Sequence, residues 1–200
     1  MRSLIILVVC LSASFCAVSQ SSDQKLILPR FIVSVGSNFS TISGSDSWEG
    51  LLPGLHIGVG LSLDPGKKGH IAYVGQVAYD MIGSKYDETS FTGKVKLSYV
   101  NIPLTVQHTS SMGILLEAGL QPGFLTSARD QYEGNDDDYK DNINSFHFAI
   151  PVGVGYVFAN VVGINLRYVQ GVTNIFKESS DPDLNRQFVL RIFWMPGLKK

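Results

Sequence analysis

Apolar and polar residues alternate along most of the chain with a period of two, as in β-strands whose two faces differ chemically. Between residues 55 and 63, leucine, isoleucine or valine at every odd position alternates with His56, Gly58, Gly60 and Ser62. We expect eight such strands, at residues 31–40, 54–63, 71–82, 94–107, 113–127, 145–158, 161–174 and 186–195. Most are close to the ten or so residues that a tilted strand needs to cross a bilayer.

The predicted fourth strand changes phase in its middle. Val95, Leu97 and Tyr99 share one parity, whereas Val100 and the apolar residues that follow share the other. A β-bulge near Tyr99 would return both sets to the same face.

The two faces of these strands indicate which side of the barrel meets lipid. The polar faces carry few charged residues, among them Asp80, Lys96, Glu117, Arg167 and Arg191. A soluble lipocalin-like barrel would expose this face to water, where about 25–35% charged residues is usual. The apolar faces carry aromatic residues, many near strand ends: Phe31, Tyr73, Tyr79, Phe124, Phe146, Tyr156, Phe158, Tyr168, Phe188 and Trp194. Aromatic girdles of this kind flank the lipid-facing band of membrane barrels. The pattern therefore predicts an eight-stranded antiparallel up-and-down transmembrane β-barrel with its polar face inside.

The interior of this barrel is expected to be filled rather than open. Glycine is frequent on the inward face, which suits a narrow barrel. Six apolar residues also point inward by parity: Leu115, Leu125, Val157, Val169, Val189 and Phe193. Glu117, Arg167 and Arg191 should lie at similar depth, so we expect the carboxylate to pair with the arginines.

The links between the predicted strands alternate in length. Residues 64–66, 108–112 and 159–160 form short turns after the second, fourth and sixth strands, and the other links are longer, above all 128–144. Outer-membrane barrels have short periplasmic turns and longer extracellular loops. An even number of strands places both termini in the periplasm.

Residues 1–19 are expected to form a cleaved signal peptide, which leaves residues 20–200 as one barrel domain. Arg2 precedes the apolar run 4–11, and Ala17-Val18-Ser19 provides small residues before the cleavage point. Both cysteines, Cys10 and Cys16, lie in this segment, so the mature chain is expected to lack disulfides. The net charge of −1 offers no basis for binding nucleic acid.

No catalytic, cofactor or metal site emerges from the sequence. His56 and His147 point inward, but no His-x-His or His-Glu-x-x-His spacing accompanies them, which favours hydrogen-bonded lumen residues over metal ligands. The acidic residues 135–138 and Asp141 lack the EF-hand spacing and are expected to form a solvated loop. Asp80 and Asp130 should lie near the extracellular rim without a serine–histidine pair, so no enzymatic activity is predicted.

Several segments resemble a known family. They are residues 36–40 (GSNFS), 97–104 (LSYVNIPL), 116–119 (LEAG), 153–156 (GVGY), 166–168 (LRY) and 173–176 (TNIF). Together they resemble the small outer-membrane β-barrel group, often called PorT-like or porin-family proteins. The resemblance implies an integral outer-membrane protein that contacts outer-membrane lipid and the barrel-insertion machinery. A role in protein secretion, with a secretion-system or surface partner, is implied for only some members. The chain departs from the family where residues 195–200 follow Trp194, since the last strand usually ends on an aromatic residue.

The sequence leaves three functions open. The first is a structural or surface-interaction barrel with a largely filled lumen. The second is a narrow pore or transporter for small solutes. The third is a soluble periplasmic barrel that binds an apolar ligand.

Overall fold

The computed structural model describes residues 29–44, 48–63, 71–88, 91–132, 135–158, 161–177 and 183–196. The predicted signal peptide lies outside these described residues. The strands are β1 (Pro29–Ser43), β2 (Trp48–Leu63), β3 (Ile71–Glu88), β4 (Phe91–Asn101), β5 (Leu104–Thr109), β6 (Ile114–Tyr132), β7 (Asn135–Asp138), β8 (Phe146–Phe158), β9 (Val162–Gly171) and β10 (Leu184–Trp194). The described ranges contain no helix of the length and apolarity that a membrane span requires.

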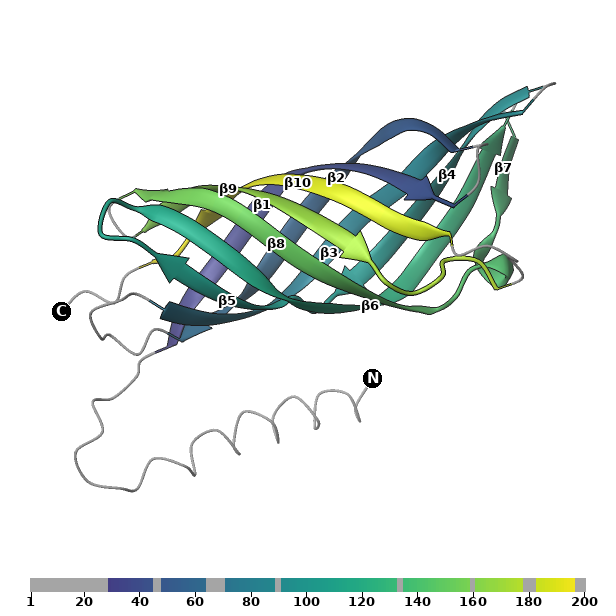
Figure 1. The fold of residues 1–200 in the computed structure, drawn as a ribbon. Helices are drawn as coiled ribbons and strands as arrows, with labels where there is room; N and C mark the ends of the chain where they lie inside the picture. Colours follow the sequence, from purple (N-terminus) through teal and green to yellow (C-terminus); the bar gives the residue numbers. More distant parts are fainter. Residues whose placement is uncertain are drawn as a thin grey trace, which may run out of the picture.

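The strands close into an antiparallel ring (Figure 1). β1, β2 and β3 pair in chain order, β6 pairs with β8, β8 pairs with β9, and β9 pairs with β10. β10 pairs with β1 to close the barrel. β4 and β5 form one wall position, because β3 and β6 pair with both of them. β7 pairs with β6 and stands outside the ring. The ring thus has the eight antiparallel wall positions that the sequence predicts. Val33 lies opposite Trp194, so the start of β1 and the end of β10 lie at the same end.

The predicted faces are confirmed over most of the wall. In β2, Val59 is 55% exposed and His56 only 1%. The outward aromatic residues form two belts. The belt near the start of β1 contains Phe31, Tyr73, Tyr156, Phe158 and Trp194, and the second belt contains Phe39, Tyr79, Phe124, Phe146, Tyr168 and Phe188. Phe31 and Phe39 are eight residues apart on β1, which is about 20 Å of barrel height at the usual rise and tilt. This spacing matches the apolar band of about 25 Å in outer-membrane barrels.

The predicted phase change in the fourth strand is wrong. Val95, Leu97 and Tyr99 point into the lumen with at most 3% exposure, and the same parity continues through Asn101. Lys96 consequently faces outward rather than inward. The register irregularity near Tyr99 does exist, but its extra residue is Thr126 of β6, since Ser98 pairs with Ser127 and Tyr99 with Leu125.

The reason for the phase error is that this part of β4 rises above the membrane. Val100 lies level with Tyr79 and Phe124 of the second belt. Residues beyond this level face water on the outside of the barrel. Above this level, apolar side chains are therefore stable only when they point into the barrel. Within the bilayer the opposite holds, because apolar side chains point outward to lipid.

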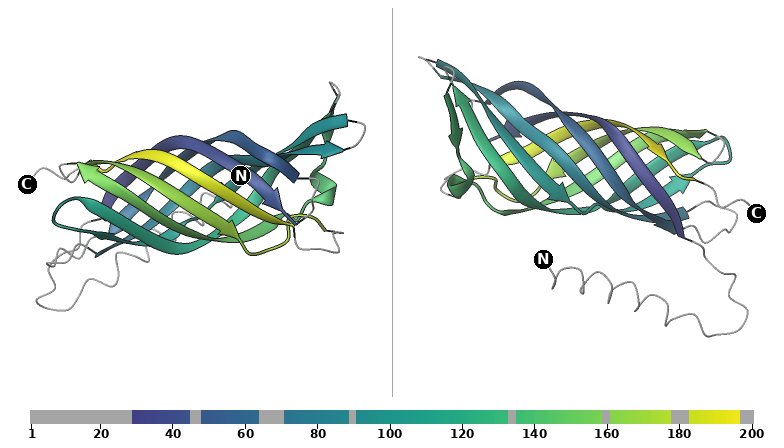
Figure 2. Two further views of the ribbon diagram at one scale, coloured as in Figure 1. Left: turned by 45° about the horizontal axis from the view of Figure 1, so that its top comes forward. Right: turned by 180° about the vertical axis from the view of Figure 1, so that it is seen from behind.

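Two predicted long links are instead extended strands. β3 continues to Glu88 and β4 begins at Phe91, so these strands form a hairpin that projects beyond the rest of the wall (Figure 2). Similarly, β1 ends at Ser43 and β2 begins at Trp48. The predicted loop 128–144 contains the end of β6, β7 and a short 3-10 helix, Lys140–Asn142. The predicted short turn after the fourth strand is confirmed, and Gly113 provides its positive φ of 91°.

Candidate functional site

The most concentrated chemistry of the molecule lies inside the barrel, around Glu117 of β6. Arg167 of β9 donates from Nε to Glu117 Oε1 over 2.6 Å and from Nη2 to Oε2 over 3.1 Å. Arg191 of β10 donates from Nη2 to Glu117 Oε2 over 3.0 Å. All three residues are at most 5% exposed. The predicted pairing of these three charges is confirmed.

Neutral side chains complete the shell around this ion-pair cluster. Gln107 donates to Glu117 Oε2 over 3.0 Å. Arg191 donates from Nη1 to Gln76 Oε1 over 2.8 Å and from Nε to Asn165 Oδ1 over 3.1 Å. Each of these polar atoms is paired with a charged group or an amide, and a buried ion pair requires such partners to be stable.

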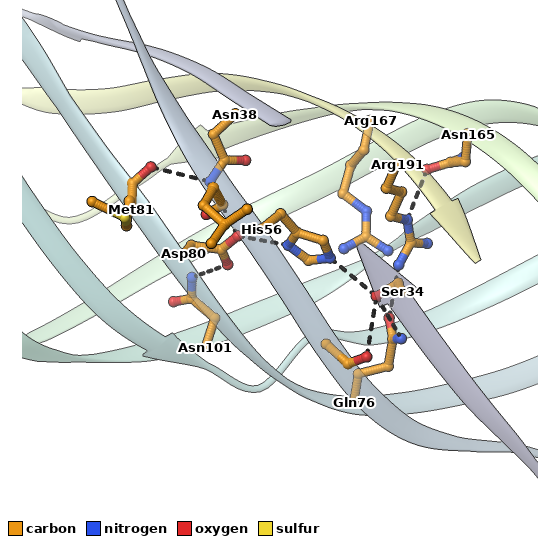
Figure 3. A network of polar contacts seen from close by, with 12 residues as sticks. Ser34, Asn38, His56, Gln76, Asp80, Met81, Asn101, Asn165, Arg167 and Arg191 are labelled. Carbon is orange, nitrogen blue, oxygen red and sulfur yellow. Dashed lines mark hydrogen bonds and ion pairs between the residues drawn. The ribbon is translucent and has the colours of Figure 1, made fainter. Parts of the chain in front are cut away.

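Asp80 of β3 organises a second cluster (Figure 3). Its Oδ1 lies 2.6 Å from His56 Nδ1 and accepts from Asn38 Nδ2 over 3.2 Å, and its Oδ2 accepts from Asn101 Nδ2 over 2.6 Å. His147 donates from Nε2 to Asn101 Oδ1 over 2.9 Å. The expectation that both histidines are hydrogen-bonded lumen residues is confirmed. The expectation that Asp80 lies at the rim is wrong, because it is 3% exposed and enclosed by the wall.

His56 also connects Asp80 to a serine. Because a carboxylate only accepts, the proton between His56 Nδ1 and Asp80 belongs to the imidazole. Its Nε2 then faces Ser34 Oγ at 3.1 Å. Serine, histidine and aspartate linked in this order form the arrangement of nucleophilic hydrolases. The structure therefore places a serine–histidine pair beside Asp80, and the expectation that none would lie there is wrong.

The surroundings of Ser34 differ from those of an active nucleophile. Ser34 and His56 are each 1% exposed, so no substrate surface reaches them. Ser34 Oγ accepts from Gln76 Nε2 over 3.4 Å. The backbone amides next to Ser34 lie in paired strands and form hydrogen bonds within the sheet. They are therefore not available to form an oxyanion hole. The set is part of a hydrogen-bonded network.

Ser34 and Gln76 join the two clusters into one lumen network. The path runs from Arg191 through Gln76 and Ser34 to His56 and Asp80 (Figure 3). The formal charges of its arginines and carboxylates cancel, since the two arginines balance Glu117 and Asp80. This balance avoids the cost of an uncompensated buried arginine or carboxylate.

Apolar side chains lie on both sides of the lumen network. Toward the start of β1 they are Ile32, Val74, Leu115, Val157, Phe193 and Met195. Toward the projecting hairpin they are Ile42, Ile82, Val95, Leu97, Tyr99, Leu125, Ala128, Ile143 and Ile175. The six inward apolar residues predicted from parity are all buried, including Val169 and Val189 in a third small cluster.

A few buried polar atoms lack a protein partner within the described residues. They include Gln121 Nε2, both side-chain polar atoms of Asn185 and Gln187 Oε1. The register places Ala149 and Gly171 between Gln121 and Asn185 on successive strands. Small residues beside unpartnered amides are typical of positions that hold buried water.

The acidic segment is engaged by its own neighbours. Tyr132 donates to Asp137 Oδ2 over 2.7 Å, and the Lys140 amide donates to Asp138 Oδ1 over 3.0 Å. Asp130 accepts from the Tyr86 hydroxyl over 2.8 Å. The part of the chain that the structure describes contains no group of three histidine, cysteine, aspartate or glutamate residues that could hold a metal ion.

Comparisons with known proteins identify the family of this chain and structures with a similar fold. Residues 19–177 match the family described as "Outer membrane protein beta-barrel domain". Neisserial surface protein A is 13% identical, with a TM-score of 0.57 over 82% of this chain and 96% of its own. The attachment invasion locus protein Ail of Yersinia pestis is also 13% identical, with a TM-score of 0.53 over 84% of this chain and 98% of its own. At this identity, both structures show a shared fold alone. No curated protein matches the sequence.

Proposed function

This chain belongs to the outer membrane protein β-barrel domain family, and from that premise we propose that it is a closed barrel with a structural and surface-interaction role. It resides in the outer membrane, as its family and its structural relatives do. This location excludes the third alternative, a soluble periplasmic barrel that binds an apolar ligand.

The observation that carries the proposal is the pairing of Glu117 with both Arg167 and Arg191. In an open, water-filled pore, separate hydration would compete with these contacts. In this barrel all three residues are buried, and an ion that crossed the lumen would have to separate them. Breaking a buried pair typically costs about 3–5 kcal/mol. Apolar clusters above and below the lumen network support the same conclusion.

A closed barrel acts through its outer wall and its ends. The projecting β3–β4 hairpin and β7 lie at one end of the barrel, and the start of β1 lies at the other. We assign the end with the hairpin to the cell exterior. We propose that outer-membrane lipid and the barrel-insertion machinery are its general partners, and that a surface or secretion partner would bind at this end.

We also propose that the barrel does not catalyse a reaction. The buried position of Ser34 supports this proposal. A fluorophosphonate probe should leave the folded protein unlabelled in detergent and in vesicles. Labelling that disappears in Ser34→Ala would contradict it and identify a hydrolase.

A narrow pore is the second candidate, and the unpartnered atoms of Gln121, Asn185 and Gln187 favour it, because buried water there would mark the start of a polar path. Planar-bilayer recordings of the purified protein separate the two. We expect no steady conductance from the wild type, and intermittent conductance from Glu117→Ala. A steady wild-type conductance would support the pore instead.

A further inference from the structure

Three lysines gather on the outward face of the projecting hairpin. Lys85 of β3 lies directly opposite Lys94 of β4, and Lys96 follows two residues later on the same face. Lys96 in turn lies opposite Arg129 of β6. Like charges placed directly opposite each other destabilise a sheet. The hairpin therefore carries this arrangement at some cost to its own stability.

Contacts among the described residues do not offset the charge of these lysines. Among the described residues, the side-chain ammonium groups of Lys85, Lys94 and Lys96 have no hydrogen bond or ion pair. Other lysines at this end behave differently: Lys140 donates to the Thr126 carbonyl oxygen and Lys177 to that of Asp141. Arg129 is excluded from the set, because β7 places Asp138 opposite it.

Protection of a sheet edge does not explain the lysines either. Lysine often blocks unwanted pairing at exposed strand edges. β4, however, pairs with β3 on one side and β6 on the other. It has no free edge in this region, so Lys94 and Lys96 serve another purpose.

The height of the lysines above the membrane suggests that purpose. Lys96 is four residues beyond Val100, which is level with the second aromatic belt, and Lys85 is six residues beyond Tyr79 of that belt. These separations correspond to about 10–15 Å above the hydrocarbon boundary. Phosphate-bearing headgroups and the first sugars of the outer leaflet occupy this layer. Lysine side chains can also bend toward it along the barrel wall.

We propose that Lys85, Lys94 and Lys96 bind the phosphate groups of the glycolipid in the outer leaflet. These are the phosphates of lipid A, the membrane anchor of lipopolysaccharide. The interaction is between ammonium groups and phosphate oxygens, and it needs no cavity. It rests on the proposed function only for the orientation of the hairpin toward the cell exterior.

The test uses purified, folded protein in detergent with bisphosphorylated lipid A, and native mass spectrometry measures the bound fraction. We expect Lys85→Gln, Lys94→Gln and Lys96→Gln together to weaken binding about a hundredfold at low salt, since each lysine near an anionic surface contributes about one tenfold factor or less. Replacing all three by arginine should preserve binding. Lys177→Gln is the matched control, because Lys177 is exposed at the same end of the barrel but donates to the Asp141 carbonyl oxygen. It should leave binding unchanged.

Three results would overturn the proposal. They are equal binding by the wild type and the triple glutamine variant, equal binding of lipid A that lacks phosphates, and full displacement by inorganic phosphate or a soluble polyanion. Heat-modifiability on gels and planar-bilayer recordings of the same samples show whether each variant is folded and closed. A folded, closed wild type that fails to bind lipid A would therefore refute this inference alone, while a conducting wild type would refute the closed barrel alone.

Discussion

Gly153 shows how closely the lumen network is fitted. A Cβ atom at this position would lie 2.7 Å from Glu117 Oε1 and 3.0 Å from Asn165 Nδ2. A flexible carboxylate could move aside, but this one is held by Arg167 and Arg191. The sequence predicts inward glycines as a way to narrow the lumen. Their specific pairing with a charged group depends on register, which the sequence does not reveal.

Gly153→Ala should therefore destabilise the folded barrel by about 1–3 kcal/mol, as overpacking usually does. The measurement is urea unfolding in lipid vesicles. Gly75→Ala is the control, because its nearest contact would be an ordinary 3.4 Å approach to Leu104. In a Glu117→Ala background the cost at Gly153 should fall. An unchanged cost would mean that the carboxylate is not what excludes the methyl group.

At the scale of the strands, alternation predicts most of the wall and fails in one definable place. Within the bilayer, an outward residue must be apolar, and β2 follows this rule from Leu55 to Leu63. Above the second belt the rule reverses, which is why Val95 and Leu97 point inward. The sequence alone does not mark the height at which lipid gives way to water. Alternation therefore misplaces the phase of the fourth strand and predicts loops where β3 and β4 extend.

Val59→Arg should test the lipid-facing surface of β2. Val59 is 55% exposed near the middle of the apolar band, where an arginine costs about 2–4 kcal/mol. Leu63→Arg, on the same face at the end of the strand, should cost about 0–1 kcal/mol. Folding yield and unfolding free energy in vesicles report both. Equal losses at the two positions would argue that residue 59 does not face lipid.

For the molecule as a whole, ring closure brings together residues that are far apart in the chain. Arg191 and Gln76 are separated by 115 positions yet share a hydrogen bond. The Glu117 cluster is predictable, because charged residues are rare in the lumen and depth can be counted along each strand. The Ser34–His56–Asp80 set is not predictable from the sequence. The three residues are far apart in the chain, and only the register of β1, β2 and β3 brings them together.

The orientation of the whole barrel is tested by thiol labelling on intact cells. Asp137→Cys on the exposed β7 should react with a membrane-impermeant maleimide. Met112→Cys, in a turn at the other end and 70% exposed, should react only after the outer membrane is broken. Labelling of Met112→Cys alone on intact cells would mean that the barrel is inverted.

The most direct test of the closed lumen is a double-mutant cycle on Glu117 and Arg167. The unfolding free energies of the wild type, Glu117→Ala, Arg167→Ala and the double variant are measured in vesicles. We expect Glu117→Ala to lose about 3–5 kcal/mol, because it leaves two buried arginines without their carboxylate. The double variant should recover part of that loss, with a coupling of about 1–3 kcal/mol. Additive losses from the two substitutions would contradict the account, because they would show that the charges are independently hydrated in an open interior.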